Sequence, residues 1–149
     1  MIIKTFLFVT CILLAADTFA QQQNEEVASL ARTTCYGNCP YYKVKVFSDG
    51  LLIYDGKSNV EYMGIHKARV SKDTVEMILK KAEEVDYMNF NIKYPVKGLG
   101  IIDFPVCITM VKTAAGKKTI WNRNDSPQKL VEYEEFFDEL IEDIDWKKI

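Results

Sequence analysis

Two cysteines four positions apart are the residues best placed to do chemistry in this chain. Cys35 and Cys39 enclose the tripeptide Tyr-Gly-Asn and are followed directly by Pro40. In an oxidising compartment such a pair forms a disulfide by default, and closing a loop of about five residues stabilises a fold by only about 2 kcal/mol. Gly37 permits the tight turn, and Pro40 biases Cys39 towards an extended backbone. We therefore interpret the pair as a structural disulfide that fixes the turn into the following strand.

A redox-active dithiol is the alternative interpretation of the same two cysteines. Thioredoxin-like motifs use a Cys-x-x-Cys spacing and place the reactive thiol at a helix N-terminus, which lowers the thiol pKa. Here the spacing is one residue longer, a strand is expected to follow, and no basic residue lies between Thr33 and Tyr42. These differences favour the structural disulfide, and reversible thiol chemistry stays open as the second interpretation.

Zinc binding is a further alternative. Beyond the first twenty residues the only plausible set of soft ligands is Cys35, Cys39, His66 and Cys107. Their spacing matches no established zinc motif. Cys107 lies in an apolar segment, where a free cysteine is usually a small buried hydrophobe. We therefore expect no bound metal and no other cofactor, and we expect Cys107 to be a core residue.

Catalytic constellations are scarce in this sequence. His66 is the only histidine, and we find neither a Gly-x-Ser-x-Gly elbow nor a Gly-rich phosphate loop. Asp103, which precedes Phe104 and Pro105, is expected to shape the start of a strand rather than to transfer protons. We assign no catalytic residue, and we favour a protein that is not an enzyme.

Two predicted strand faces could together form a ligand surface. Strand parity places Tyr41, Lys43, Lys45 and Phe47 on one face of the first hairpin, and Lys117, Thr119, Trp121 and Arg123 on one face of the second. The ligand-surface candidates among them are Tyr41, Lys43, Lys45, Lys117 and Trp121. They would offer stacking and positive charge to a glycan or an acidic peptide. The favoured and simpler interpretation is the solvent side of an amphipathic sheet.

The last expected helix is strongly acidic. Its acidic residues are Glu132, Glu134, Glu135, Asp138, Glu139, Glu142, Asp143 and Asp145. Such a run could complement a basic partner, but it is more often a solvated helix face, which is the interpretation that we favour.

Alternating apolar and polar residues predict the strands that position these groups. Residues 41–47 alternate as a half-buried strand does, and the Ser-Asp-Gly turn at 48–50 leads into a partner strand at 51–54. Residues 60–70 form a weaker predicted strand, in which Gly64 is a bulge or bend. A first hairpin with an additional strand is therefore expected.

Two segments change to a helical period. Residues 72–87 carry apolar side chains on one face, and Ser71 is a suitable N-cap. Ser126 followed by Pro127 is typical of a helix start, and the buried stripe that follows predicts a helix that ends near Asp145, with Trp146 packing at its exit. The buried stripe consists of Leu130, Tyr133, Phe137, Leu140, Ile141 and Ile144.

A second predicted hairpin, residues 106–111 and 117–122, lies between the two helices. The order of strands, helix, hairpin and helix predicts an α+β fold. We expect an antiparallel sheet of two or more hairpins with two helices packed on one face.

Residues 1–20 have the pattern of a secretory signal peptide. Lys4 precedes an apolar run at 6–16, and Ala20 offers the cleavage site. The run is too short and too interrupted for a membrane span, which needs about 20 apolar residues. Acylation at Cys11 is disfavoured because only about six apolar residues precede that cysteine. We therefore expect an exported protein, periplasmic or secreted, without a transmembrane span in the mature chain.

The rest of the chain has the length of one domain. Residues 21–26 are polar and are expected to form a flexible tether, and residues 27–149 a single α+β domain. The formal net charge is −2, which gives no bias towards nucleic acid. The partner stays open, with an envelope protein or a glycan as candidates.

Several motifs resemble one known protein family. They are Arg32-Thr33-Thr34-Cys35-Tyr36-Gly37-Asn38-Cys39-Pro40-Tyr41-Tyr42, Phe47-Ser48-Asp49-Gly50, Tyr54-Asp55-Gly56 and Asp103-Phe104-Pro105. They resemble the bacterial exported domain-of-unknown-function family 6438, over nearly all of the chain beyond the signal peptide. The Cys-x-Gly-x-Cys-Pro core is the most specific part. Cys35 and Cys39 fall on it, whereas Cys107 falls at an ordinary strand position, which weakens the zinc interpretation.

The resemblance implies an exported envelope or secreted protein, and it lends neither an activity nor a catalytic residue. Together with the residues above, it predicts a non-catalytic binding or interaction domain with a structural disulfide.

Overall fold

The computed structural model describes residues 24–149, so the predicted signal peptide and residues 21–23 of the predicted tether lie outside the described residues. The strands are β1 (Glu26–Arg32), β2 (Tyr41–Phe47), β3 (Leu51–Ser58), β4 (Gly64–Arg69), β5 (Lys93–Tyr94), β6 (Cys107–Thr113), β7 (Gly116–Asn122) and β8 (Lys147–Lys148). The α-helices are α1 (Lys72–Glu84) and α2 (Gln128–Glu142), and Tyr87–Asn89 forms a short 3-10 turn. The prediction of an α+β fold is confirmed.

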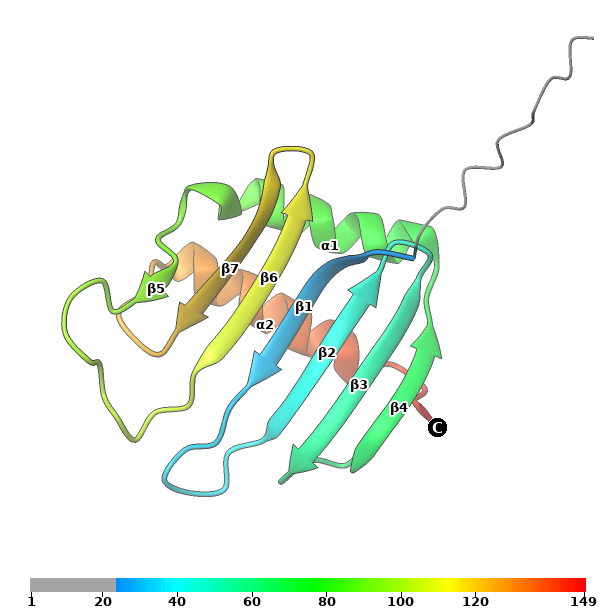
Figure 1. The fold of residues 1–149 in the computed structure, drawn as a ribbon, viewed down its shortest axis with the longest axis horizontal. Helices are drawn as coiled ribbons and strands as arrows, with labels where there is room; N and C mark the ends of the chain where they lie inside the picture. Colours follow the sequence, from blue (N-terminus) through cyan, green and yellow to red (C-terminus); the bar gives the residue numbers. More distant parts are fainter. Residues whose placement is uncertain (1–23) are drawn as a thin grey trace, which may run out of the picture.

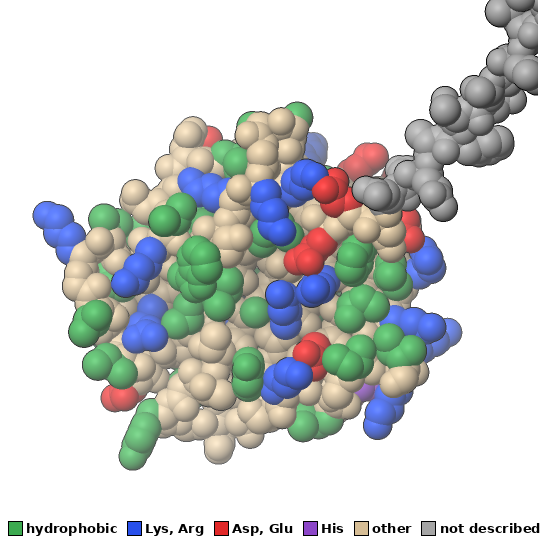
Figure 2. Space-filling view, in the orientation of Figure 1, with side chains coloured by type: hydrophobic (Ala, Val, Ile, Leu, Met, Phe, Trp, Pro, Cys, Tyr) green, Lys and Arg blue, Asp and Glu red, His purple; other side chains and the backbone are tan. Residues whose placement is uncertain are grey.

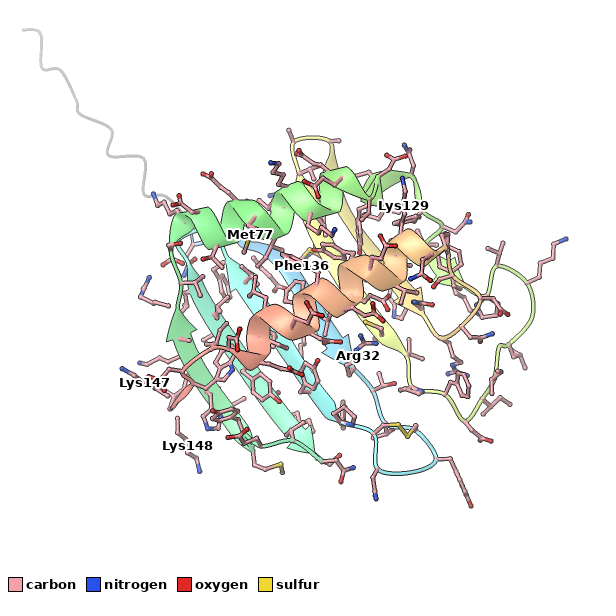
Figure 3. All side chains as sticks on the ribbon, turned by 180° about the vertical axis from the view of Figure 1, so that it is seen from behind. Arg32, Met77, Lys129, Phe136, Lys147 and Lys148 are labelled. Atoms are coloured by element: carbon pink, nitrogen blue, oxygen red, sulfur yellow. A yellow bond between two sulfur atoms is a disulfide. The ribbon has the colours of Figure 1, made fainter. Side chains whose placement is uncertain are left out.

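All eight strands form one sheet in the order β5-β7-β6-β1-β2-β3-β4-β8. Every neighbouring pair is antiparallel except β5 and β7. Both helices lie behind the sheet in Figure 1 and in front of it in Figure 3, where the view is reversed. We call the helix-covered side the inner face and the other side the open face. Figure 2 looks onto the open face, over which Lys and Arg side chains are spread.

The core fills the space between the inner face and the helices. Its fully buried side chains include Leu30, Val44, Leu52, Ile78, Ile120, Leu130, Tyr133 and Phe137. Alternate residues of β2 contribute to it, as the sequence period indicates, because Tyr42, Val44 and Val46 are buried between more exposed neighbours. The amphipathic pattern of the strands therefore places their apolar side on the helices.

The first strand was not predicted as a strand, although structure was expected to begin near Val27, and the two-residue strands β5 and β8 were not predicted either. β1 lies in the middle of the sheet and pairs with both β2 and β6. Leu30 of β1 lies opposite Val44 on one side and Thr109 on the other. The N-terminal strand therefore joins the two parts of the sheet.

Helix ends differ from the predictions in ways that local chemistry explains. Ser71 caps α1 as predicted, since its hydroxyl accepts from the backbone N–H of Thr74 at 3.1 Å. The helix stops at Glu84 rather than at residue 87, and Asp86 then takes a positive φ of 60° that no α-helix can continue. Because the helix ends before Tyr87, this side chain is buried in the core from the 3-10 turn rather than from the helix.

The predicted N-cap of the last helix is wrong. Pro127 rather than Ser126 occupies the N-cap of α2, and no side chain caps that end. The helix ends at Glu142 instead of near Asp145. The chain then turns back, and Trp146 packs just after the helix as the sequence predicted, buried against Tyr54 of β3.

The weak strand predicted for residues 60–70 is shorter in the structure. β4 begins at Gly64, and the residues before it form a turn that starts with Asn59 at a φ of 55°. This turn packs closely on Gly56, where an added Cβ would lie 1.9 Å from the carbonyl oxygen of Tyr62. Gly56 therefore allows the β3–β4 connection to bring Tyr62 over the inner face.

Candidate functional site

The connection between β1 and β2 contains the cysteine pair. Cys35 and Cys39 lie at disulfide-bonding distance, with their Cα atoms 5.6 Å apart, and Figure 3 shows the bond beside the end of the sheet. Tyr36, between them, is 92% exposed. Pro40 then leads directly into β2, as the sequence predicted. The pair therefore closes a small loop at the edge of the inner face.

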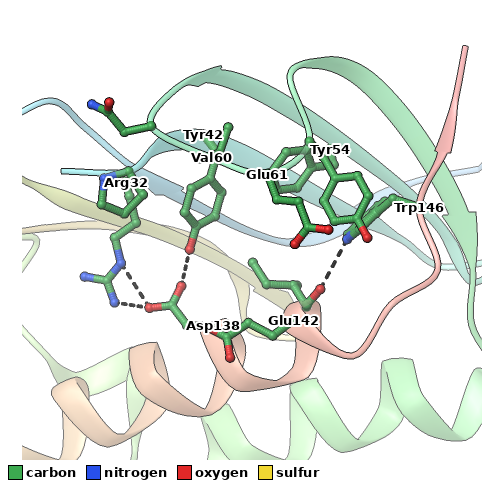
Figure 4. Close-up of a pocket in the computed structure, with 12 residues that line it drawn as sticks. Arg32, Tyr42, Tyr54, Val60, Glu61, Asp138, Glu142 and Trp146 are labelled. Atoms are coloured by element: carbon green, nitrogen blue, oxygen red, sulfur yellow. Dashed lines mark hydrogen bonds and ion pairs between the residues drawn. The ribbon is translucent and has the colours of Figure 1, made fainter. Parts of the chain in front are cut away.

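A polar cluster lies on the inner face next to this loop. The Arg32 guanidinium donates from Nε to the Asp138 carboxylate at 3.1 Å, and its Nη2 donates to the same oxygen. The Tyr42 hydroxyl donates to the other oxygen of Asp138 (Figure 4). Burial raises the pKa of Tyr42, and Asp138 raises it further. Tyr42 is therefore a neutral donor, and Asp138 ties the last part of β1 and the start of β2 to α2.

Glu134 lies deeper, one helical turn before Asp138. Only 3% of the residue is exposed, and Asn122 of β7 donates to its two oxygens at 3.0 and 3.1 Å. The Arg32 Nη1 is 3.8 Å away. Burial raises the pKa of Glu134 to about 7, although Asn122 and Arg32 act to lower it. This carboxyl group therefore titrates near neutral pH.

Both acids correct the expectation of a solvated acidic helix face. Glu134 is buried and Asp138 is partly buried, and the two lie four residues apart on the side of α2 that faces the sheet. That spacing was the signal that could have found them, because residues four apart share one face of a helix. Their partner Arg32 carried no comparable signal in the sequence.

Cys107 is buried, as the sequence predicted, but its neighbours are polar. Its thiol lies against Glu134, close to Arg32 and Asp138. Burial raises the pKa of the Cys107 thiol well above its ordinary value, and the negative charge of Glu134 raises it further. The thiol therefore stays protonated at neutral pH, and a reactive thiolate is disfavoured there.

A pocket of about 490 Å³ opens beside the polar cluster, and we call it the helix-side pocket. Its lining comes from the ends of β1 and β2, from β3, from the β3–β4 connection, and from α2 with the turn that follows. In Figure 4, Arg32, Tyr42 and Asp138 form one end, and Tyr54, Glu61 and Trp146 form the other. Pro40, just after the cysteine pair, also lines it.

Aromatic rings form one wall of the helix-side pocket. The rings of Tyr42 and Tyr54 are stacked with centroids 5.4 Å apart, and Trp146 lies 5.1 Å from Tyr54. Tyr62 meets Tyr54 edge to face at 6.3 Å. The Trp146 indole donates to the carbonyl oxygen of Ile141 at 3.2 Å, which fixes the ring. The wall is therefore held in place by packing on both sides.

Two carboxylates also line the helix-side pocket. Glu61 and Glu142 are both exposed, and neither forms an ion pair with any residue in the described part of the chain. Arg32, the one basic residue in the lining, is held by Asp138. The free charge of the pocket is therefore negative.

Three of the five predicted surface residues lie around one hollow on the open face. Tyr41, Lys43 and Lys117 line this hollow of about 360 Å³. Lys45 does not line it and pairs with Glu26 at 3.4 Å. Trp121 lines a different hollow, towards β5.

The single histidine packs behind the aromatic wall. His66 is buried on β4, with its ring edge to face with Tyr62 at 5.5 Å. Its Nδ1 lies 3.3 Å from the carbonyl oxygen of Gly64. Within residues 24–149, no three His, Cys, Asp or Glu side chains are grouped as metal ligands would be, so the possible zinc ligands do not converge.

Comparison with known proteins identifies the family. Residues 26–141 match a family described as a domain of unknown function, DUF6438. The chain belongs to the DUF6438 family. No curated protein and no solved structure matches it significantly. The segment shared with DUF6438 contains the cysteine pair, Arg32 and Asp138, and it ends five residues before Trp146.

Within residues 24–149 neither helix has the length and apolar character that a membrane span needs.

Proposed function

We propose that this protein is an exported, non-catalytic binding domain whose helix-side pocket receives a positively charged group of its ligand. One observation carries the proposal, namely that an aromatic wall and two unpaired carboxylates line the same pocket. Export rests on the signal-peptide pattern of residues 1–20 and on the cysteine pair, because disulfides persist in oxidising compartments.

The chemistry of the pocket favours a cation over other ligand groups. Aromatic rings attract cations through their quadrupoles, and Trp is the strongest of the aromatic side chains in this respect. Tyr54 and Trp146 line the pocket and supply such rings, although most of each side chain is buried. Glu61 and Glu142 add negative charge at the opening. An anionic group would find only Arg32, whose guanidinium is already bound by Asp138. A Lys or Arg side chain of an envelope protein fits this environment.

The polar cluster supports a positioning role rather than catalysis. Asp138 accepts from both Arg32 and Tyr42, so its carboxylate is engaged in joining α2 to the sheet. The cysteine pair has a related role in our proposal, since the loop that it closes ends at Pro40 on the pocket wall. Reversible thiol chemistry and zinc binding are the alternatives, and no contact described above favours either.

The proposal can be tested by titrating the protein, followed by NMR, with N-acetyl-lysine amide and N-acetyl-arginine amide. We expect saturable shifts of the Trp146 indole signal and of neighbouring amides, and none with the neutral N-acetyl-glutamine amide. Replacing both Glu61→Gln and Glu142→Gln should weaken binding about twofold to thirtyfold, because each exposed ion pair contributes about 0.2–1 kcal/mol.

Glu132→Gln with Glu139→Gln is the matched control. Both of these residues are exposed on α2 and neither lines the pocket, so binding should be unchanged. Equal shifts with the glutamine amide would contradict the charge preference. If none of the three amides shifted any pocket signal, the binding role of the pocket would be wrong.

A further inference from the structure

The connection between β5 and β6 exposes large apolar side chains that the core does not use. Leu99 is 75% exposed and Ile102 is 72% exposed, and Val96, Ile101 and Phe104 are each about half exposed or more. We call residues 95–106 the apolar loop. Contiguous exposed apolar groups of this kind mark surfaces that contact a partner or a membrane.

The cysteine loop lies against the apolar loop. The backbone N–H of Tyr36 donates to the carbonyl oxygen of Asp103 at 3.4 Å, and that of Thr33 donates to the carbonyl oxygen of Val106 at 3.0 Å. Figure 1 shows both loops at the same end of the sheet. We define the loop edge as Tyr36, Leu99, Ile101, Ile102 and Phe104. The backbone of the exposed Tyr36 is thus hydrogen-bonded to the apolar loop.

The backbone holds the apolar loop in its exposed position. Gly98 and Gly100 take positive φ values of 79° and 71°. The side-chain oxygen of Asn124 accepts from the backbone N–H of Ile101 at 3.2 Å, and an added Cβ on Gly100 would lie 2.6 Å from that oxygen. The exposure of the neighbouring apolar side chains is therefore a consequence of a specific turn rather than of a loop without contacts.

Basic residues surround the loop edge. Lys93 and Arg123 line a hollow of about 510 Å³ together with Leu99, Ile102 and Trp121. Within the described residues, none of Lys93, Lys97 and Arg123 forms an ion pair. Lys112, Lys117 and Lys118 lie at the other end of β6 and β7, so the charged residues near the loop edge are the basic Lys93, Lys97 and Arg123 and the acidic Asp103 and Asp125. Basic residues therefore outnumber acidic ones at this end of the sheet, although the chain as a whole has a net charge of −2.

We propose that the loop edge docks on an anionic lipid bilayer. Leu99, Ile102 and Phe104 enter the boundary between headgroups and acyl chains, where apolar side chains lose contact with water. Lys93, Lys97 and Arg123 contact the lipid phosphates, since basic residues are attracted to anionic leaflets. Tyr36 and Trp121 suit the headgroup region, where amphipathic aromatic rings are enriched.

A bilayer fits this surface better than a second copy of the chain does. In a two-fold dimer the same patch would face itself, so the basic residues Lys93, Lys97 and Arg123 would face an equally basic patch of the other copy. Like charges in contact are unfavourable, whereas an anionic surface complements both the charge and the apolar side chains. No residue of the loop edge lines the helix-side pocket, so this proposal does not depend on a cationic ligand.

The test is vesicle flotation of the protein as it is recovered after export from an expressing bacterium, with its N-terminus determined by mass spectrometry. We expect binding to phosphatidylcholine vesicles that contain phosphatidylglycerol, weaker binding to phosphatidylcholine alone, and release at high salt. Because all variants share one N-terminus, differences between them report on the loop edge.

Two double variants separate the apolar and charged contributions. Leu99→Ser with Ile102→Ser should lower the partition coefficient at least about tenfold on anionic vesicles. Lys93→Gln with Lys97→Gln should lower it about thirtyfold on anionic vesicles and leave the weaker binding to neutral vesicles unchanged. Ile65→Ser with Met77→Ser is the matched control, because both side chains are about half exposed elsewhere and Met77 lies on α1 (Figure 3).

The control should bind as the unmodified protein does. Absence of binding to anionic vesicles would overturn the proposal, as would equal binding by the Leu99 and Ile102 variant. A reversible dimer that disappears in that variant, detected by analytical ultracentrifugation without lipid, would instead assign the edge to self-association.

Discussion

At the residue scale, the most important feature is the carboxyl group of Glu134, which is buried on the inner side of α2. A buried charge is unfavourable unless it is paired and hydrogen-bonded. Glu134 has Asn122 as a donor, the Cys107 thiol against it, and Arg32 nearby, while Arg32 is bound more closely to Asp138. The Arg32 guanidinium therefore lies near two carboxylates but is hydrogen-bonded only to Asp138. The negative charge of Glu134 is the less well neutralised of the two.

The titration of Glu134 gives a prediction for stability against pH. Its pKa rises from an ordinary 4.5 to about 7 in the folded protein, first because of burial. The folded state therefore keeps a proton that the unfolded state releases between these two values. The stabilisation from this group is fully present below pH 4.5 and is lost as the pH rises to about 7, a change of up to about 3 kcal/mol. Glu134→Gln cannot titrate, so relative to the unmodified protein it should gain stability over this range.

Urea unfolding of both proteins at about pH 5 and about pH 8 measures this difference. Glu132→Gln serves as the control, because Glu132 is exposed on the same helix. Asn122, Cys107, Arg32 and Asp138 remain unchanged in both variants. Parallel pH profiles of the unmodified protein and Glu134→Gln would show that Glu134 keeps an ordinary pKa.

At the scale of elements, the sequence predicted those strands and helices that have one buried face and one face exposed to solvent. β2 alternates apolar and polar residues because only its inner face is buried, and α1 shows its period and its Ser71 cap for the same reason. β1 carries small residues on the open face, Ser29 and Ala31, and Ser29 is buried like its neighbours Ala28 and Leu30, so its alternation is weak. The central strand was therefore harder to define than the strands outside it.

The helix-side pocket could not be predicted from spacing. Its polar end joins Arg32 to Asp138, which are 106 positions apart in the chain. Its aromatic wall joins β3 to a tryptophan beyond α2. The cysteine pair could be predicted because its two residues are only four positions apart. Whether they can form a disulfide is decided by the turn between them and not by the rest of the fold.

The short span of the cysteine pair makes a prediction for the β1–β2 connection. Cys35→Ser with Cys39→Ser should lower the free energy of unfolding by about 2 kcal/mol and leave the fold intact, since only a small loop is released. Denaturant unfolding combined with circular dichroism measures both outcomes, and the reduced unmodified protein should lose the same amount. Complete loss of folding would contradict the local role.

Thiol quantification on natively purified protein distinguishes a structural disulfide at the cysteine pair from a redox-active dithiol. A structural disulfide should resist mild reductant. Ready and reversible reduction, with Cys107 remaining unreactive in the folded state, would favour thiol chemistry at the pair.

At the scale of the whole molecule, the helix-side pocket and the loop edge are two surfaces of opposite charge. The carboxylates of α2 and of the β3–β4 connection face the helix-side pocket, and unpaired basic residues surround the loop edge. A molecule held on an anionic bilayer by the loop edge would present a negative pocket, which the same bilayer repels and a basic partner does not. The two proposals therefore assign compatible tasks to separate surfaces.

The central position of β1 predicts that the sheet unfolds as one unit. β1 joins β6, β7 and β5 on one side to β2, β3, β4 and β8 on the other. The chain has two tryptophans, and they report on the two sides, since Trp121 lies on β7 and Trp146 packs against Tyr54 of β3. Each can be followed alone in the variants Trp146→Phe and Trp121→Phe.

Within each single-tryptophan variant, the fluorescence transition in urea should coincide with the transition in circular dichroism. Adding Leu30→Ala, which empties a fully buried position of β1, should lower the free energy of unfolding by about 2–5 kcal/mol. That is a large part of the roughly 5–15 kcal/mol typical of a domain. The loss should be the same at both tryptophans, because neither side of the sheet retains a central partner when β1 separates. A midpoint shift at Trp146 without one at Trp121 would instead mean that β6, β7 and α2 hold together without β1, and that the two sides of the sheet are separate folding units.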